Sequence, residues 1–315
     1  MTKILVTGGA GFIPSCLTSE LIKNPNYKVV AVDNFLTGHK LKISKSEFDN
    51  FTFIEADCND YDQMKAIFDD NSFDYVFHYA AVVGVKRTTD HPLQVLEDIE
   101  GLNHIFKLSS SSNVKRIFFS SSSEVYGEPV EMPQNEDTTP LNSKLPYAIV
   151  KNIGEAYCRS YFYEYGLKYT IFRFFNTFGP KQSPDFVMSK FIRQALNNED
   201  ITIYGDGSQT RTFCYVDDNI LACMTAFEEE RFVNDVINVG NDKETSILEL
   251  AKLIIEETKS KSKIIFLPPL KEGDMSRRQP STEKVRSLLN REFLPIKAGI
   301  KKVISSSLYK QLNEL

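Results

Sequence analysis

Short apolar runs and segments of helical period alternate along the first half of the chain. The runs Lys3–Val6 and Val29–Val32 each end at glycine or polar residues, which is typical of strands buried on both faces. Between them, the apolar residues of Phe12–Ile22 recur with the period of a helix. We therefore predict a strand, a helix and a second strand, because parallel strands need a crossover of this kind.

The same alternation continues as far as Phe172. It predicts the α/β fold class, with a Rossmann-type doubly wound parallel sheet. The further strands predicted are Phe51–Ile54, Tyr75–Phe77, Arg116–Phe119 and Tyr169–Phe172, and the further helices are Asp60–Phe68, Leu93–Leu108 and Ala148–Tyr165.

The pattern becomes irregular after Gly179-Pro180. It predicts a turn at Asp206–Ser208, a helix at Asp217–Glu228, a strand at Val236–Val239 and a helix at Ile247–Thr258. We expect a smaller α/β lid that is interleaved with the sheet domain. The predicted division assigns residues 1–176 and about 212–240 to the sheet domain, and about 177–211 and 241–315 to the lid.

Composition narrows the class of protein. The 315 residues are 42% hydrophobic and 25% charged, as in an ordinary globular protein rather than a disordered one. With 37 Lys and Arg against 42 Asp and Glu, the net charge of −5 leaves no basic stripe for a nucleic acid. The first apolar stretch is too short for a signal segment or a membrane span, so we expect a cytoplasmic protein without a membrane partner.

Cysteine and histidine offer no metal site. The five cysteines contain no C-x-x-C pair, and the four histidines show no H-x-x-x-H spacing. We therefore expect reduced thiols in the core and no bound metal.

The turn after the first strand predicts a dinucleotide site. Gly8 and Gly11 follow that strand and open the first helix, where glycine lets the backbone approach a pyrophosphate. Asp33, at the end of the second strand, suits the ribose hydroxyls of NAD and repels the 2′-phosphate of NADP. Asp57 either contacts the adenine amine or caps a helix. The cofactor residues predicted are Gly8, Gly11, Phe12, Ile13, Asp33, Asn34, Asp57, Cys58, Ala80, Tyr147 and Lys151.

A tyrosine and a lysine four residues apart predict proton transfer. Tyr147 and Lys151 lie on one face of a predicted helix. The ammonium of Lys151 would lower the pKa of the Tyr147 phenol, so that the phenol can accept a hydroxyl proton while a hydride leaves. The serine run that ends at Ser122 and Ser123 lies at the end of the preceding predicted strand. It can bring hydroxyls to the substrate carbon that loses the hydride.

These motifs together resemble the extended short-chain dehydrogenase/reductases that act on nucleotide-activated sugars. The likeness spans nearly the whole chain, and the motifs resemble those of the family in their order and spacing. It rests on the segments TGGAGF, VDNF, FHYAA, SSSSEVYGEP, YAIVK, RFFNTFGP and IYGDGSQTRTFCYVDD. The patterns are similar to those of UDP-glucuronate decarboxylases, sugar 4-epimerases and the GDP-heptose 4-dehydrogenases of bacterial capsule (polysaccharide) biosynthesis, all of which first oxidise carbon 4 of the sugar.

The resemblance implies roles for individual residues. Ser122 matches the catalytic Ser/Thr, Tyr147 the base and Lys151 its partner, with Ser123 and Glu124 beside them. It implies that the first domain binds NAD and the second the nucleotide sugar, and that the protein is a homodimer paired through Ala148–Tyr165. The substrate-binding residues implied are Lys86, Asn176, Tyr204, Arg211 and Arg278, although without the family pattern a surface salt bridge would be the expected role of the two arginines.

The sequence departs from the family pattern in several places. Pro14 replaces the third glycine of the turn, Asp98 stands where an Asn is usual, and Val82–Thr89 has no obvious template. The loss of an N–H at Pro14 is harmless in a first helical turn, but its ring adds bulk where helix and strand pack closely.

The pair Ser123-Glu124 bears on the reaction. A 4,6-dehydratase has an Asp-Glu pair here, so dehydration is disfavoured. The resemblance implies an NAD-dependent oxidoreductase that converts the carbon-4 hydroxyl of a nucleotide sugar into a ketone, as a 4-dehydrogenase or 4-epimerase. The alternatives are a decarboxylase of the UDP-glucuronate type and a catalytically inactive protein that senses NAD and binds a partner. A glutamate that only hydrogen-bonds the loop after the strand is the structural alternative for Glu124.

Overall fold

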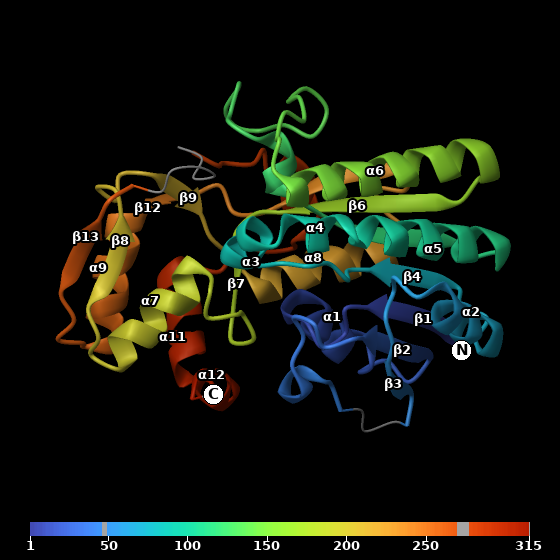
Figure 1. Ribbon diagram of the computed structural model, residues 1–315, viewed down its shortest axis with the longest axis horizontal. Helices are drawn as coiled ribbons and strands as arrows, with labels where there is room; N and C mark the ends of the chain where they lie inside the picture. Colours follow the sequence, from blue (N-terminus) through green and yellow to red (C-terminus); the bar gives the residue numbers. More distant parts are fainter. Residues whose placement is uncertain (46–48, 270–276, 315) are drawn as a thin grey trace. The chain divides into compact units, whose positions relative to one another are not determined.

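The computed structural model describes residues 1–45, 49–269 and 277–314, except for the side chains of Val85, Lys86 and Thr89 (Figure 1). Internal contacts divide the chain into two compact units. Unit 1 comprises Met1–Val125, Lys144–Arg173 and Ile220–Ile237, and unit 2 comprises Tyr126–Ser143, Phe174–Asn219 and Asn238–Leu315. The sequence-based division placed 126–143 with the first domain, and its assignment of NAD and sugar binding stays a prediction.

A seven-stranded sheet in the order β11-β6-β5-β4-β1-β2-β3 forms the core of unit 1, and only the last residue of β6 and the last two of β11 belong to unit 2. The pairs β1–β2, β2–β3, β1–β4 and β4–β5 are parallel. This confirms the predicted Rossmann-type sheet, because the strand order reverses beside β1. The strands are β1 (Thr2–Thr7), β2 (Tyr27–Asp33), β3 (Phe51–Glu55), β4 (Tyr75–His78), β5 (Arg116–Ser122), β6 (Lys168–Phe174) and β11 (Asp235–Val239).

Alternate residues of the strands pack against helices on opposite faces. Val76, Ile117 and Phe119 join the core cluster formed with one set of helices, α2 (Tyr61–Asp70), α5 (Asp98–Ser111) and α6 (Pro146–Tyr165). Phe77 and Phe118 stack on each other and meet Phe227 of α8 (Val216–Glu228) edge-on. Side chains return to the same face every two residues in a strand and every 3.6 residues in a helix. This difference explains why the apolar pattern could distinguish the strands from the helices.

One predicted helix is wrong in its extent. The segment Leu93–Leu108 forms two helices, α4 (Pro92–Leu96) and α5, which are separated at Glu97. Glu97 keeps helical dihedrals, with φ −60° and ψ −27°. The apolar residues therefore keep the helical period on both sides of Glu97, and the sequence pattern does not show where α4 ends. Unit 1 also contains α1 (Phe12–Leu21), a 3₁₀ turn η1 (Lys40–Lys42), α3 (Val85–Asp90), which the sequence did not predict, and a 3₁₀ turn η2 (Ser123–Tyr126) that continues into unit 2.

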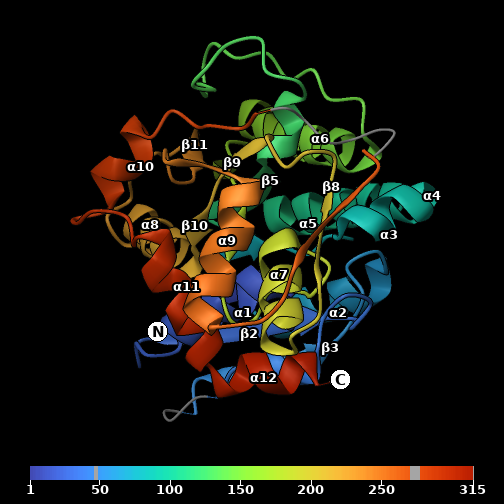
Figure 2. The same cartoon turned by 90° about the vertical axis from the view of Figure 1, so that its left-hand side faces the viewer.

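Unit 2 holds short strand pairs and helices. Strands β8 (Ile201–Tyr204) and β13 (Ile264–Leu267) are parallel, and β9 (Thr210–Thr212) and β12 (Glu244–Ser246) are antiparallel. Helices α7 (Val187–Leu196) and α9 (Ile247–Thr258) pack against each other and against β8 (Figure 2). The remaining elements are β7 (Thr177–Phe178), β10 (Cys214–Tyr215), α10 (Glu283–Leu288), α11 (Ile296–Ser305) and α12 (Ser307–Asn313).

All five cysteines are free thiols, as predicted; four are buried and Cys16 is half-buried. No helix in the described part of the chain combines the length and the apolar character needed to cross a membrane.

Candidate active site

The turn between β1 and α1 brings backbone close to backbone. Gly8 has a φ of +74°, and a Cβ on it would lie 2.9 Å from the Cα of Ala80, so only glycine fits there. Gly11 donates its N–H to the carbonyl of Gly8 at 2.7 Å and is the N-cap of α1. The N-cap Gly11 has no side chain to cap α1, so the first N–H groups of the helix suit a ligand, and the partial positive charge there favours an anion.

Pro14 does not disturb the start of α1. The helix begins at Phe12, so Pro14 is its third residue, where an N–H has no partner inside the helix. The ring lies beside the turn, since a Cβ on Gly11 would be 3.2 Å from the Cγ of Pro14. The effect of this added bulk on cofactor binding remains a prediction.

The carboxylate of Asp33 ties the glycine turn to the end of β2. It accepts from the N–H of Ala10 at 3.0 Å and from that of Phe35 at 2.7 Å. Burial raises the pKa of Asp33, while the N–H groups of Phe35 and Ala10 act to lower it. The cradle at Gly8, the uncapped helix and this carboxylate fit a dinucleotide with free ribose hydroxyls.

Asn34 and Asp57 form a second polar pair at the same edge. The amide of Asn34 donates to the Asp57 carboxylate at 3.0 Å. Asp60 caps α2, accepting from the N–H of Gln63 at 3.0 Å, so the idea that Asp57 is the helix cap is wrong. Cys58 is buried, and burial raises the pKa of its thiol. The contact of Asp57 with adenine stays a prediction.

Thr7 joins the ends of β1 and β4, a role that the sequence analysis missed. Its hydroxyl accepts from the N–H groups of Tyr79 and Ala80, at 3.0 and 3.1 Å, and meets Nδ1 of His78 at 2.8 Å. Burial, and then repulsion by Lys151, lower the pKa of His78 to about 3, so the ring is neutral at physiological pH. This contact shapes the loop that carries Ala80.

Lys151 reaches from α6 to the carboxyl end of β5. Its ammonium donates to the Ser120 hydroxyl at 3.3 Å and lies 5.7 Å from the centre of the Tyr147 ring. Only 4% of Lys151 is exposed, and burial lowers its pKa to about 8, although the charge of Asp98 opposes this. The helix can lie this close to β5 because residue 154 is a glycine: a Cβ at Gly154 would overlap the Phe119 ring.

The other predicted catalytic residues lie at the same end of β5 or at the start of α6. Ser122 is the last residue of β5, and its hydroxyl accepts from the N–H of Glu124 at 3.2 Å. Ser123 is buried, and Glu124 is half-buried in the 3₁₀ turn that follows. Tyr147 is the second residue of α6 and packs against the core cluster. Together with the bond from Lys151 to Ser120, these positions place the start of α6 beside the end of β5 that carries the serine run.

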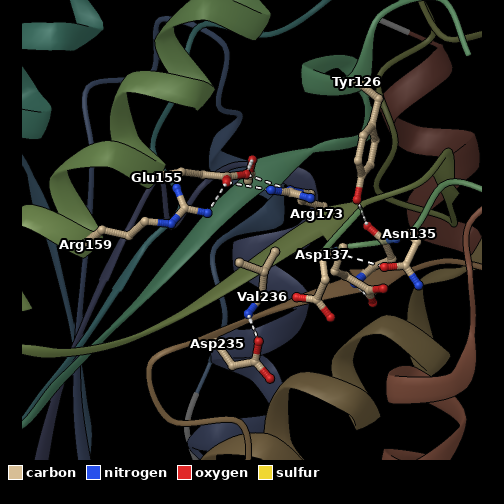
Figure 3. A network of polar contacts seen from close by, with 11 residues as sticks. Tyr126, Asn135, Asp137, Glu155, Arg159, Arg173, Asp235 and Val236 are labelled. Carbon is tan, nitrogen blue, oxygen red and sulfur yellow. Dashed lines mark hydrogen bonds and ion pairs between the residues drawn. The ribbon is translucent and has the colours of Figure 1, made fainter. Parts of the chain in front are cut away.

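A buried ion pair fixes α6 against β5 and β6 (Figure 3). Glu155, one turn after Lys151, accepts from Nε and Nη2 of Arg173, each at 2.8 Å, and from the Ser121 hydroxyl at 2.7 Å. Burial raises the pKa of Glu155, but the hydrogen bonds and charge of Arg173 outweigh it, so the pKa is lowered. Ser121 lies between Ser120 and Ser122, so the pair sets the register of the helix on the catalytic strand.

Asp98 gives the site a negative charge where the family pattern has an amide. Its carboxylate accepts from the N–H of Val82 at 2.7 Å, and its charge acts on Lys151. Burial raises the pKa of Asp98, while Val82 and Lys151 act to lower it. The carboxylate therefore helps Lys151 to keep its proton.

We expect Asp98→Asn to move the alkaline limb of turnover to lower pH. The amide oxygen can still accept from Val82, but the charge that favours the Lys151 ammonium is gone, so the pKa of Lys151 falls further. The pH–rate profiles of both proteins measure this, with the exposed Asp62→Asn as the control. Superimposable profiles would show that Asp98 does not act on Lys151.

The residues implied in sugar-nucleotide binding, other than Lys86, belong to unit 2. Arg211 and Arg278 are each only 7% exposed, so neither is a surface side chain, and their role in binding stays a prediction. Asn176 has a φ of +36°, and its buried side-chain amide nitrogen has no hydrogen-bond partner among the described residues. Tyr204 lines a pocket with Gly205, Asp206, Gln209 and Phe266. The side chain of Lys86 lies outside the described residues.

Comparison with known proteins agrees with this geometry. Residues 4–240 match the NAD dependent epimerase/dehydratase family. The chain is 38% identical over 301 residues to the UDP-N-acetyl-alpha-D-glucosaminuronate decarboxylase of Bacillus cytotoxicus, covering 91% of each chain.

Solved structures have the same fold. The UDP-glucose 4-epimerase of Thermotoga maritima with UDP-glucose superimposes with a TM-score of 0.91 at 33% identity, covering 98% of this chain and 99% of that one. The UDP-glucuronic acid 4-epimerase of Bacillus cereus with UDP-glucuronic acid and NAD gives 0.88 at 29%, covering 99% and 100%. This protein is a member of the NAD-dependent epimerase/dehydratase family of enzymes.

Proposed function

We propose that the protein oxidises the carbon-4 hydroxyl of a nucleotide-activated sugar to a ketone, as a 4-dehydrogenase or 4-epimerase. The observation that carries the proposal is the buried ammonium of Lys151, which bonds to Ser120 and lies beside the Tyr147 ring. A buried cation next to a phenol favours the phenolate, which is the form needed to accept a proton. The glycine turn and Asp33 supply the dinucleotide site on the same unit.

Each residue of the site has a separate role in the proposed oxidation. Bound NAD supplies the hydride acceptor. Tyr147 takes the proton of the carbon-4 hydroxyl, and Lys151 stabilises the phenolate and holds the nicotinamide ribose. Ser122 orients the same hydroxyl by a hydrogen bond. Loss of one proton and one hydride turns the alcohol into the ketone.

Unit 2 offers groups suited to the nucleotide sugar. Arg211 and Arg278 are permanently charged and forked, which suits a diphosphate. The amide nitrogen of Asn176 is buried and has no partner in the part of the chain that the structure describes, and a diphosphate oxygen would supply the acceptor it needs. Tyr204 is 40% exposed, so its ring is available as a platform for the base.

A panel of UDP-, GDP- and dTDP-sugars, followed by chromatographic separation and mass spectrometry, tests the function. A product that has lost two hydrogens indicates a dehydrogenase, and a new isomer of unchanged mass indicates an epimerase. Tyr147→Phe is the control that should give neither. Absence of any product and of any reduced cofactor across the panel would instead support the inactive NAD-binding protein.

Decarboxylation is the second candidate. The pair Ser123-Glu124 resembles that of the decarboxylases, and the Bacillus cytotoxicus relative is one. A ketone at carbon 4 turns a uronic acid into a β-keto acid, which loses carbon dioxide readily. Release of carbon dioxide from a UDP-uronic acid in the same panel would decide for this candidate.

We expect NAD(H) to co-purify with the protein, because Asp33 at the end of β2 suits ribose hydroxyls and repels a 2′-phosphate. Denaturation and chromatography of the released nucleotide measure this. Recovery of NADP, or tighter binding of NADP, would contradict the role of Asp33.

We also propose a homodimer paired through α6. Ile153, Tyr157 and Tyr161 pack in part against the core of their own chain, which leaves less free surface than the sequence predicted. Ile149, Phe162, Tyr163 and Tyr165 of the same helix remain exposed. Light scattering should give the dimer mass, and Ile149→Glu should shift it towards the monomer. A monomer mass for the unaltered protein at micromolar concentration would refute the dimer.

A further inference from the structure

One hydrogen bond in unit 1 joins the segment after β2 to the segment after β4. Nη1 of Arg87 in α3 donates to the carbonyl oxygen of Leu36 at 2.9 Å. Leu36 follows β2, and Arg87 lies in the segment that follows β4. In the sheet, β1 lies between β4 and β2 and pairs in parallel with both, with Thr7 opposite Val32 on one side and His78 on the other. The contact therefore joins segments from the two sides of the strand that carries the turn.

The turn itself has no cation. The segment Thr7–Pro14 contains neither lysine nor arginine, so a pyrophosphate held there by N–H groups would keep its negative charge. Lys42, in the loop after β2, is buried and its charge acts on Asp33. A cation for the pyrophosphate has to come from another segment.

Arg87 has the charge and the free donors for this task. It is half-buried, and none of the carboxylates in the described ranges pairs with it. A guanidinium has five N–H donors in a fixed fork, and the bond to Leu36 uses one of them. A charge held near a dinucleotide site and left without a carboxylate favours an anionic ligand.

We propose that Arg87 is a cofactor-retention residue, which bonds to the Leu36 carbonyl and to the pyrophosphate of the dinucleotide and so slows its release. The inference rests on the proposed function, since it concerns the same NAD site. It would also explain the use of an arginine: a neutral side chain could tie the loops together, but only a cation also offsets the negative charge of the pyrophosphate.

The experiment compares the purified protein with Arg87→Gln and Arg87→Lys. The dissociation rate of NAD is measured by exchange against labelled NAD, and the affinities for NAD, ADP and adenosine by competition. We expect Arg87→Gln to release NAD about 10- to 100-fold faster, as for loss of one charge-assisted hydrogen bond. ADP should weaken along with NAD, adenosine should not, and Arg87→Lys should recover part of the loss.

Two results would overturn the inference. Unchanged release of NAD from Arg87→Gln would remove Arg87 from cofactor binding. An equal loss for NAD, ADP and adenosine would mean that Arg87 only supports the loops. Arg286→Gln, in unit 2, is the matched control for the substitution itself, with melting temperatures for all variants. If the unaltered protein bound no NAD, the proposed function would fail first, before any variant was compared.

Discussion

Tyr147→Phe is expected to lower turnover by about 10²–10⁴-fold, because the variant lacks the group that accepts the hydroxyl proton. The ring itself packs against the core of unit 1 and is retained, so the fold and the binding of NAD should survive. Single-turnover reduction of bound NAD, followed by the absorbance of the reduced nicotinamide, measures the step. Wild-type rates from a normally melting variant would remove Tyr147 from the mechanism.

Two further variants separate the roles at this site. Ser122→Ala should cost less than Tyr147→Phe, because an orienting hydrogen bond contributes only about 0.5–1.5 kcal/mol. Lys151→Met should weaken NAD binding as well as turnover, since the ammonium serves both the ribose and the phenol. Equal losses in all three variants, with unchanged NAD affinity, would contradict this division of roles.

Glu155→Ala is expected to destabilise the protein by about 3–5 kcal/mol, because it leaves the Arg173 guanidinium buried without its partner. Nη2 of Arg173 lies 2.8 Å from the carboxylate, and the two side chains are 2% and 0% exposed. The Ser121 hydroxyl loses its acceptor as well. Urea denaturation measures the free energy of unfolding.

Arg159→Ala is the matched control. Arg159 bonds to the same carboxylate at 3.2 Å, but its side chain is 47% exposed, so solvent screens the pair and the loss should stay below about 1 kcal/mol. Because the pKa of Glu155 is lowered in the folded state, its contribution is present at neutral pH and is lost as the pH falls through that lowered pKa. Equal effects of both substitutions would show that the buried pair is not the stabilising contact.

The apolar pattern predicted the sheet of unit 1 well and unit 2 poorly. Strands of the first half are buried between two layers of helices, so each appears as a continuous apolar run. In unit 2, β8 and β13 have four residues each, and they pair across sixty-three positions, with Ile201 opposite Ile264. Such short strands are defined by their partner more than by their own sequence. Helix α7 was missed although its apolar residues follow the helical period.

The sequence by itself determined the local parts of the site. A glycine turn between a strand and a helix, and Tyr147 one turn before Lys151, follow from the geometry of neighbouring residues. The alternation of apolar runs and helical periods predicted the fold class, and the resemblance that these motifs carry implied the family chemistry.

Only the tertiary structure decided which distant groups meet. Glu155 pairs with Arg173, Thr7 meets His78 across seventy-one positions, and Arg87 bonds to Leu36 across fifty-one positions. The charge of Asp98 acts on Lys151, and the buried amide nitrogen of Asn176 has no partner within residues 1–45, 49–269 and 277–314. The sequence records how strongly each residue prefers the interior, but the path of the chain selects its partner, and burial then makes that partner's charge or hydrogen bond strong.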